Sequence, residues 1–128
     1  MIKEAYVSFE VAKLLKEKGF NEPIRCWYDN FQDFHEEGVR MSNSDCLPPT
    51  IMCPTQAMAM AWLRKVHNIF IEPRAGETDG KTWYDFDIIP INGREIVWNH
   101  YNYIPLVECN SYEEALEVAL RYTLENLI

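Results

Sequence analysis

Three carboxylates in the second half of the chain have the types and spacing that could hold a divalent cation. Asp85 and Asp87 are two residues apart in the run TWYDFDIIPI, and Glu72 ends the preceding β-like run. Alternate residues of a strand share one face of a sheet, so the two aspartates would lie side by side, with Glu72 on a neighbouring strand. Oxygen ligands suit Mg²⁺ and Ca²⁺, and such a cation could support hydrolysis. Any half-exposed sheet shows the same alternation, so this site is an alternative hypothesis and not the main one.

The run Trp98–Tyr103, WNHYNY, has the most unusual local composition. Aromatic side chains with polar tips are typical of protein interfaces and ligand grooves, although ordinary sheet packing explains them too. Trp27 and Trp83 could extend such a surface, and a helix flank offers a second one. The predicted interaction residues are therefore Trp83, Trp98, His100, Tyr101, Tyr103, Met60 and Arg64.

The spacing of the cysteines and histidines does not indicate a catalytic or metal site. Cys46 and Cys53 are seven residues apart, which is not the short paired spacing of a zinc site. Cys53 precedes a predicted helix and His67 ends it, so the two would be about 20 Å apart at 1.5 Å per residue. The glycine-rich nucleotide-binding motifs are absent from the sequence, and we predict no cofactor.

Composition favours a soluble acidic domain. The 128 residues carry 20 acidic and 12 basic side chains, a net charge of −8. A binder of nucleic acid or of an anionic membrane needs a basic surface, so we expect neither partner. No apolar run is long enough to span a membrane, and the N-terminus lacks the apolar core of a signal peptide, so a cytoplasmic location is expected.

In the first half of the chain, two helices are predicted with a long irregular segment between them. Ser8 and Gly19 delimit a helix over about 9–18, and Thr55 precedes one over 56–67. Residues 24–29 alternate like a strand. The acidic segment 30–53 has scattered apolar residues and stays unassigned, apart from a possible strand near 38–41.

The second half reads as a strand meander followed by a helix. Strands are predicted at 68–72 and 82–91, with a polar turn over 74–81 between them. Asn92-Gly93 indicates a hairpin turn, and one or two strands follow, broken or placed at an edge by Pro105. Ser111 and Glu114 form a capping box that begins the last helix.

These elements predict one α+β domain over residues 1–128. It would have a small antiparallel sheet of three to five strands, with three helices packed mainly on one face.

Three stretches carry a family resemblance. YVSFEVAKLLKEKGF, PTQAMAMAWLRKVHNIFIEP and YEEALEVALRYTLENLI resemble a family of small uncharacterised proteins encoded in phage-like and mobile-element regions of gut anaerobic bacteria. The resemblance implies a cytoplasmic accessory protein of mobile-element origin. It supplies neither an activity nor functional residues.

The main functional hypothesis is therefore a non-enzymatic accessory module that binds an unknown protein partner or a second copy of itself. The first alternative is a divalent-cation hydrolase or nuclease that uses Glu72, Asp85 and Asp87. The second is an acidic mimic of DNA, which would need the acids of 29–45 and 111–125 along one surface.

Overall fold

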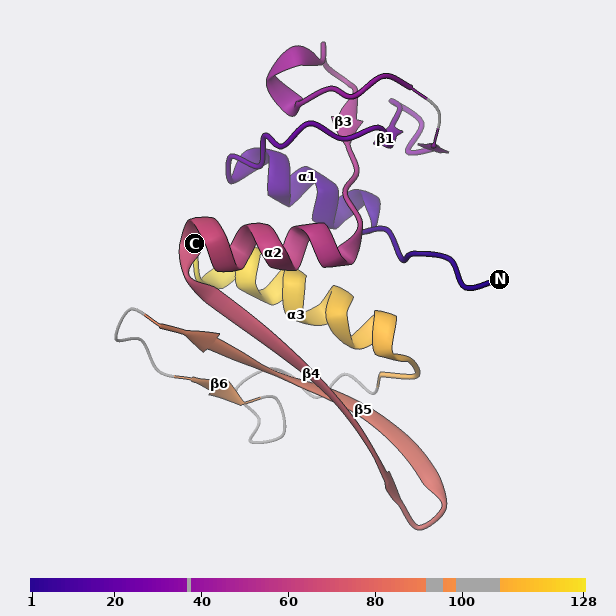
Figure 1. Cartoon of the computed structure of the whole chain (residues 1–128), viewed down its shortest axis with the longest axis vertical. Coiled ribbons are helices and arrows are strands. Elements are labelled where there is room, and N and C mark those ends of the chain that lie inside the picture. Colours follow the sequence, from indigo (N-terminus) through magenta and orange to yellow (C-terminus); the bar gives the residue numbers. More distant parts are fainter. Residues whose placement is uncertain (37, 92–95, 99–108) are drawn as a thin grey trace. The chain divides into compact units, whose positions relative to one another are not determined.

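The computed structural model describes residues 1–36, 38–91, 96–98 and 109–128. Three α-helices and two small antiparallel sheets confirm the predicted α+β class, with the strands divided between two sheets and not gathered in one (Figure 1). The chain divides into two compact units, residues 1–59 and 60–128, and the division falls inside the second helix. Within the described ranges, no helix is long and apolar enough to cross a membrane.

The first unit begins with helix α1 (Phe9–Glu17), which the sequence predicted almost to the residue. The Ser8 hydroxyl caps it by accepting a hydrogen bond from the Val11 amide at 3.2 Å. Gly19 follows with φ of +96°, a left-handed conformation that favours glycine after a helix. The helix buries Val11, Ala12 and Leu15, so its apolar face forms part of the core of this unit.

The sheet of the first unit is made of two-residue strands. Strand β1 (Trp27–Tyr28) lies between β2 (Phe34–His35) and β3 (Ile51–Met52), and both pairings are antiparallel. A single bridge joins Ile24 to Met41. The short helix η1 (Asn43–Asp45) precedes β3, so the segment 30–53 that the sequence left unassigned holds β2, η1 and β3.

Helix α2 (Gln56–His67) leads into the long hairpin of the second unit, and the Thr55 hydroxyl caps it at the Met58 amide. Strands β4 (Ile69–Thr78) and β5 (Lys81–Pro90) pair over ten residues each. The predicted polar turn over 74–81 is wrong, because residues 74–78 continue β4. The turn is Asp79-Gly80, with φ of 52° and 77°, the positive values that a tight hairpin turn requires.

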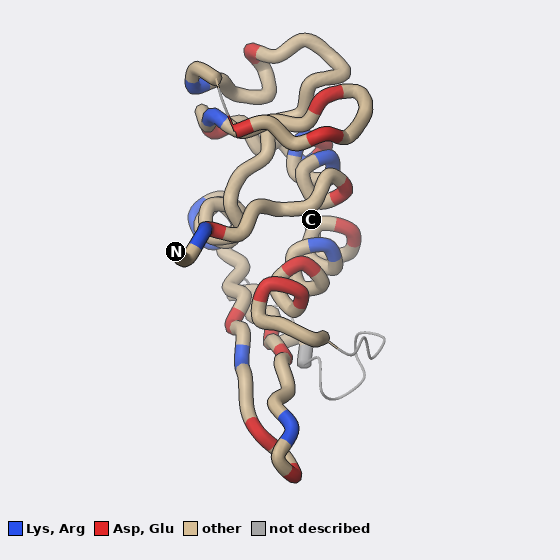
Figure 2. The backbone as a smooth tube through the Cα atoms, turned by 90° about the vertical axis from the view of Figure 1, so that its right-hand side faces the viewer, with Lys and Arg blue, Asp and Glu red and all other residues tan. Residues whose placement is uncertain are grey.

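Helix α3 (Tyr112–Asn126) packs on β4 and β5 within the second unit. The Ser111 hydroxyl caps its N-terminus as predicted, by accepting from the Glu114 amide at 3.1 Å. The Glu114 carboxylate accepts from the Asn110 amide, one residue before the amide that a capping box uses, so the predicted box differs in its second hydrogen bond. Six residues of the helix are buried: Ala115, Leu116, Ala119, Leu120, Thr123 and Leu124. Acidic residues recur along the length of the helix (Figure 2).

The two faces of the hairpin differ in character. Phe86 and Ile88 are fully buried on one face, opposite Pro73 and Ile71. Strand β6 (Val97–Trp98) pairs with the edge of β5 that does not pair with β4. Side chains of a strand alternate between its faces, so Asp85 and Asp87 lie on the face opposite Phe86. That face is not exposed there as an alternating pattern would suggest, because both aspartates are buried as well.

Candidate functional site

The first unit contains an apolar groove of about 450 Å³. It is lined by three stretches of chain: β1, the segment 38–41 and the segment 45–52. The lining includes one carboxylate, Asp45, and is otherwise mostly apolar. We call it the Trp27 groove, after the largest of its six apolar lining side chains: Trp27, Val39, Met41, Cys46, Leu47 and Met52.

The indole of Trp27 is held in place by a stacked histidine. The rings of Trp27 and His35 are 4.0 Å apart between centroids and inclined by 12°, as their direct register opposition in β1 and β2 allows. The His35 Nε2 is 2.8 Å from Asp29 Oδ2, so the carboxylate fixes the orientation of the imidazole. The aromatic wall of the groove is thus built before any ligand arrives.

Asp29 is itself anchored by the turn that joins β1 to β2. Its Oδ1 accepts hydrogen bonds from the amides of Phe31 at 2.8 Å and Asp33 at 3.0 Å. The hydrogen bond from His35 and that from the Asp33 amide lower the pKa of the Asp29 carboxyl. Asp29 is therefore ionised at neutral pH and remains an acceptor for His35.

The Asp29–His35 pair is suited to positioning and not to nucleophilic catalysis. Within the described ranges, the hydrogen bond of the His35 imidazole is with Asp29, and no hydroxyl or thiol is bonded to it. A catalytic dyad of this kind would need a nucleophile within hydrogen-bond reach of the histidine.

Gly38 lets the chain approach the indole closely. A Cβ at this position would lie 3.3 Å from the Arg25 carbonyl oxygen and 3.6 Å from the Trp27 Nε1. The first distance is tighter than ordinary contact, so a larger residue would push segment 38–41 away from β1. Glycine therefore keeps the two walls of the groove together.

Hydrogen bonds of Asn43 hold in place the wall of the Trp27 groove that contains Met52. Its side-chain amide donates to the Phe20 carbonyl at 2.8 Å and accepts from the Met52 amide at 3.0 Å, all in buried surroundings. Asn43 therefore ties η1 both to the end of the first helical segment and to β3, which carries Met52.

The thiol of Cys46 in the groove is not primed for reaction. It donates to the Ser42 carbonyl oxygen and contacts the Met52 sulfur, each at 3.3 Å. Burial raises the pKa of Cys46, so the thiol form prevails at neutral pH. The other three cysteines are buried free thiols, and Cys53 donates to the Val7 carbonyl oxygen at 3.3 Å.

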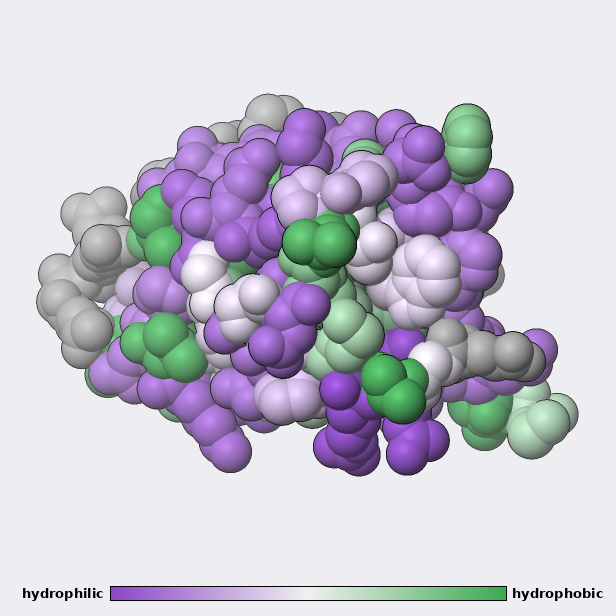
Figure 3. Space-filling view, turned by 90° about the horizontal axis from the view of Figure 1, so that it is seen from above, coloured by the Kyte–Doolittle hydropathy of each residue, from purple (hydrophilic) through white to green (hydrophobic). Residues whose placement is uncertain are grey.

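Two apolar side chains of the groove lie open to solvent. Val39 is 75% exposed and Leu47 is 83% exposed. Figure 3 looks onto the first unit from the side of β1, β3 and η1, and it shows hydrophobic residues with hydrophilic ones around them. Apolar side chains gathered beside a pocket are a mark of binding surfaces.

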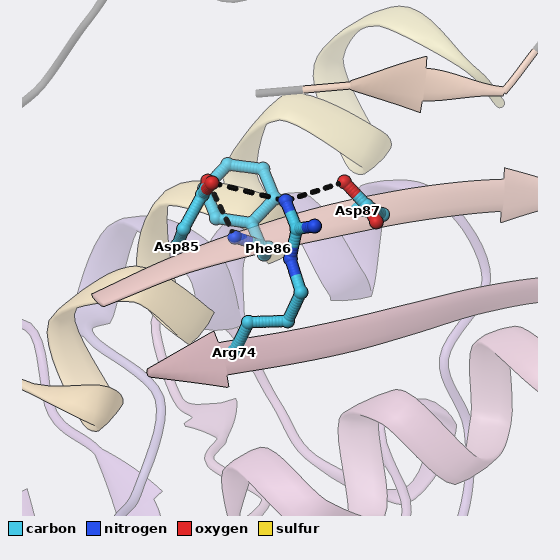
Figure 4. A network of polar contacts seen from close by, with 4 residues as sticks. All are labelled: Arg74, Asp85, Phe86 and Asp87. Carbon is cyan, nitrogen blue, oxygen red and sulfur yellow. Dashed lines mark hydrogen bonds and ion pairs between the residues drawn. The ribbon is translucent and has the colours of Figure 1, made fainter. Parts of the chain in front are cut away.

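The register of β4 and β5 places the three predicted carboxylates on one sheet face. Arg74 lies on the same face, between Asp85 and Asp87 (Figure 4). Glu72 is directly opposite Asp87 in the register, and Arg74 is opposite Asp85. The Arg74 Nη2 donates to Asp85 Oδ2 and to Asp87 Oδ1, both at 3.0 Å. Asp85 and Asp87 are 9% and 5% exposed, whereas Glu72 is exposed.

This arrangement does not favour a cation between the carboxylates. The guanidinium already bridges the two buried aspartates, and Asp85 Oδ1 also accepts from the Phe86 amide at 2.7 Å. Among the described residues, no group of three His, Cys, Asp or Glu side chains could hold a metal ion. The half-buried Arg74 side chain and the two buried carboxylates thus form an ion-pair network, which is a structural feature in its own right.

The predicted interaction residues are only partly described. Trp83 is 40% exposed and its indole covers Gly76 on β4. Arg64 is exposed on α2, where Met60 is half-buried. Trp98 lies in β6 opposite Asp87. His100, Tyr101 and Tyr103 lie outside the described residues, as do the Asn92-Gly93 turn and Pro105, so this surface stays a prediction.

Comparisons with protein-family models, with curated proteins and with solved structures gave no match. Sequence reasoning included Trp27 as an aromatic that could line a groove, but missed Val39 and Leu47. One sequence feature could have indicated Val39 and Leu47. The apolar residues between 38 and 52 follow neither a helical nor a strand periodicity, as is expected of apolar side chains that do not belong to the core.

Proposed function

We propose that this protein is a binding module whose Trp27 groove takes up a hydrophobic side chain from an extended segment of a partner protein. The observation that carries the proposal is the exposure of Val39 and Leu47 beside a preformed aromatic wall. Buried aromatic and aliphatic anchors dominate the energetics of protein interfaces. A partner side chain in the groove would remove both exposed residues from water.

The chemistry of the lining supports binding and not catalysis. Asp45 is the one carboxylate among the lining residues, and the Cys46 thiol is held protonated by burial. Met41 and Met52 have flexible, polarisable side chains that adapt to different apolar partners. A small-molecule enzyme would need several convergent polar groups instead.

Selection from a random-peptide library displayed against the purified protein tests this proposal. We expect enriched peptides with an aromatic or aliphatic anchor. They should bind the Leu47→Glu variant at least tenfold more weakly, because an apolar side chain of the groove would be replaced by a second carboxylate beside Asp45. Val66→Glu is the matched control, since Val66 is also exposed, at 58%, but lies in the second unit. The proposal fails if no peptide is enriched or if Leu47→Glu binds as well as the control.

A second copy of the chain is the other occupant to distinguish. Light scattering after size-exclusion chromatography would show a dimer that becomes a monomer on Leu47→Glu and not on Val66→Glu. That result would identify self-association as the use of the groove.

The other functional hypotheses stay predictions. A cation-dependent hydrolase would have to displace Arg74 from Asp85 and Asp87. The DNA-mimic hypothesis needs acids from residues 29–45 and 111–125, which belong to different compact units. An origin in a mobile element rests on the sequence resemblance alone.

A further inference from the structure

A second pocket of the first unit, which shares no lining residue with the Trp27 groove, has a different chemistry. Its volume is about 350 Å³, within the range of small-molecule sites. We propose that it binds a small organic anion, with the carboxylate or phosphate group held between Arg25 and Arg40. Its principal lining residues are Tyr6, Arg25, Arg40, Cys53, Thr55 and Met58.

The backbone brings the two arginines together. Ile24 and Met41 exchange hydrogen bonds of 3.0 and 2.8 Å between their amides and carbonyls. Arg25 follows Ile24 and Arg40 precedes Met41, so they are the next opposed pair in an antiparallel arrangement. Residues opposed in this way have neighbouring side chains, and two like charges there destabilise the pairing.

Neither arginine is held in an ion pair by the described residues, although the protein carries 20 acidic residues. Both arginines are exposed. Glu4 also lines the pocket, so the lining has two positive charges and one negative charge. An oxyanion would relieve the repulsion, since guanidinium groups bind carboxylate and phosphate in a two-pronged geometry.

The rest of the lining suits an organic body attached to the anion. Ile24, Pro54 and Met58 supply apolar surface. The hydroxyl of Tyr6, whose pKa is raised to about 12 chiefly by its hydrogen bond with Cys26, stays protonated beside them. The start of α2 is already capped by Thr55, whose hydroxyl accepts from the Met58 amide at 3.1 Å. The anion is therefore assigned to the arginines and not to the helix terminus.

Nuclear magnetic resonance titration with inorganic phosphate and, separately, with benzoate tests this assignment at constant ionic strength. We expect at least one probe to give saturable shifts of the Arg25 and Arg40 side-chain Nε–H signals. In the double variant Arg25→Gln/Arg40→Gln its affinity should fall at least tenfold. Arg64→Gln, which removes an exposed arginine of the second unit, should leave the affinity unchanged.

The two probes also distinguish the chemical classes of ligand. Saturable binding of phosphate alone assigns a phosphate ligand, binding of benzoate alone assigns a carboxylate with an apolar body, and binding of both assigns a general oxyanion site. Linear shifts without saturation for both probes, or affinity retained in the double variant, would overturn the proposal.

Arginine modification of the unaltered protein provides an independent readout. Phenylglyoxal reacts with exposed guanidinium groups, and mass spectrometry locates the products. Arg25 and Arg40 should be protected several-fold by the probe that binds, whereas Arg64 should not. Equal protection of all three would contradict a specific site.

Discussion

At the scale of single residues, Asn43 is the clearest example of a polar side chain that determines local structure. It is 7% exposed, and its amide completes hydrogen bonds for the Phe20 carbonyl and the Met52 amide. Buried backbone groups need such partners, and their loss is expensive. No helical or strand period announces this role, so sequence analysis left the segment unassigned.

Replacing Asn43 by alanine should destabilise the protein. Two buried backbone groups would lose their partner, which predicts a decrease of about 2–4 kcal/mol in the free energy of unfolding. Urea denaturation measures the change. Asn21→Ala is the control, because Asn21 makes comparable hydrogen bonds to Ser44 at an exposed site, and its effect should be below about 0.5 kcal/mol. Equal effects of the two substitutions would contradict the assigned role.

His67 is a second residue whose surroundings have a measurable consequence. It ends α2 with its ring 4.8 Å from that of Trp62, and its buried Nε2 has no hydrogen-bond partner among the described residues. Burial lowers the pKa of His67 below its usual 6.5, because the charged form is poorly solvated there.

The lowered pKa of His67 predicts a loss of stability at acidic pH. The unfolded chain takes up the proton first, so the folded state loses stability as the pH falls below about 6.5 and continues to lose it down to the folded-state pKa. Thermal unfolding of the wild type between pH 7 and 5 should therefore show a steeper fall in midpoint than His67→Gln. The same slope in both proteins would show that His67 does not titrate in this way.

At the scale of elements, the β4–β5 hairpin depends on a glycine facing an aromatic ring. Gly76 is opposite Trp83 in the register, and a Cβ on Gly76 would overlap the indole. The indole Nε1 also donates to the Thr78 hydroxyl at 3.1 Å. The ring thus covers bare backbone on the neighbouring strand.

Gly76→Ala should weaken this hairpin, although alanine normally suits a strand better than glycine. The new methyl group would displace the Trp83 ring from β4 and break its bond to Thr78, at a cost of up to about 1 kcal/mol. Chemical denaturation would measure the loss, and the Trp83 indole N–H signal should move. Glu77→Ala, at the exposed neighbouring position, should change neither. A gain in stability for Gly76→Ala would contradict the packing described.

The elements that could be predicted from the sequence are those in which apolar residues recur periodically over many positions, together with a recognisable helix N-cap where the element is a helix. Ser8 and Ser111 marked the starts of α1 and α3, and the alternation in 82–91 gave the two faces of β5. The alternation over 24–29 predicted β1, although the strand itself is limited to Trp27–Tyr28. Strands β2 and β3 have two residues each, which is too short for any alternation to appear.

The extent of β4 was underestimated for a related reason. Arg74, Gly76 and Glu77 have the composition of a turn, but the ladder to β5 and the ion pairs of Arg74 keep them extended. Tertiary pairing overrode local composition, and the Asp79-Gly80 step was the actual turn signal.

At the scale of the whole molecule, each of the two proposed binding sites is assembled from residues that are distant in the sequence. The Trp27 groove is lined by β1 and by segments 38–41 and 45–52. The second pocket, which contains Arg25 and Arg40, is lined by residues from segments 4–6, 23–26 and 53–58 and by Arg40 itself. Sequence spacing does not reveal such assemblies, because each stretch alone reads as an ordinary loop or strand end. A net charge of −8 also conceals the locally basic pair Arg25 and Arg40.

Methionine methyl signals would show whether the Trp27 groove is the surface that binds a partner. Met41 and Met52 line the groove, whereas Met1, Met58 and Met60 do not. With ¹³C-methyl-methionine protein and the tightest peptide from the library selection, we predict saturable shifts of the Met41 and Met52 signals, with the other three unchanged. Shifts concentrated at Met60, with Met41 and Met52 unmoved, would contradict the account and favour the flank of α2 instead.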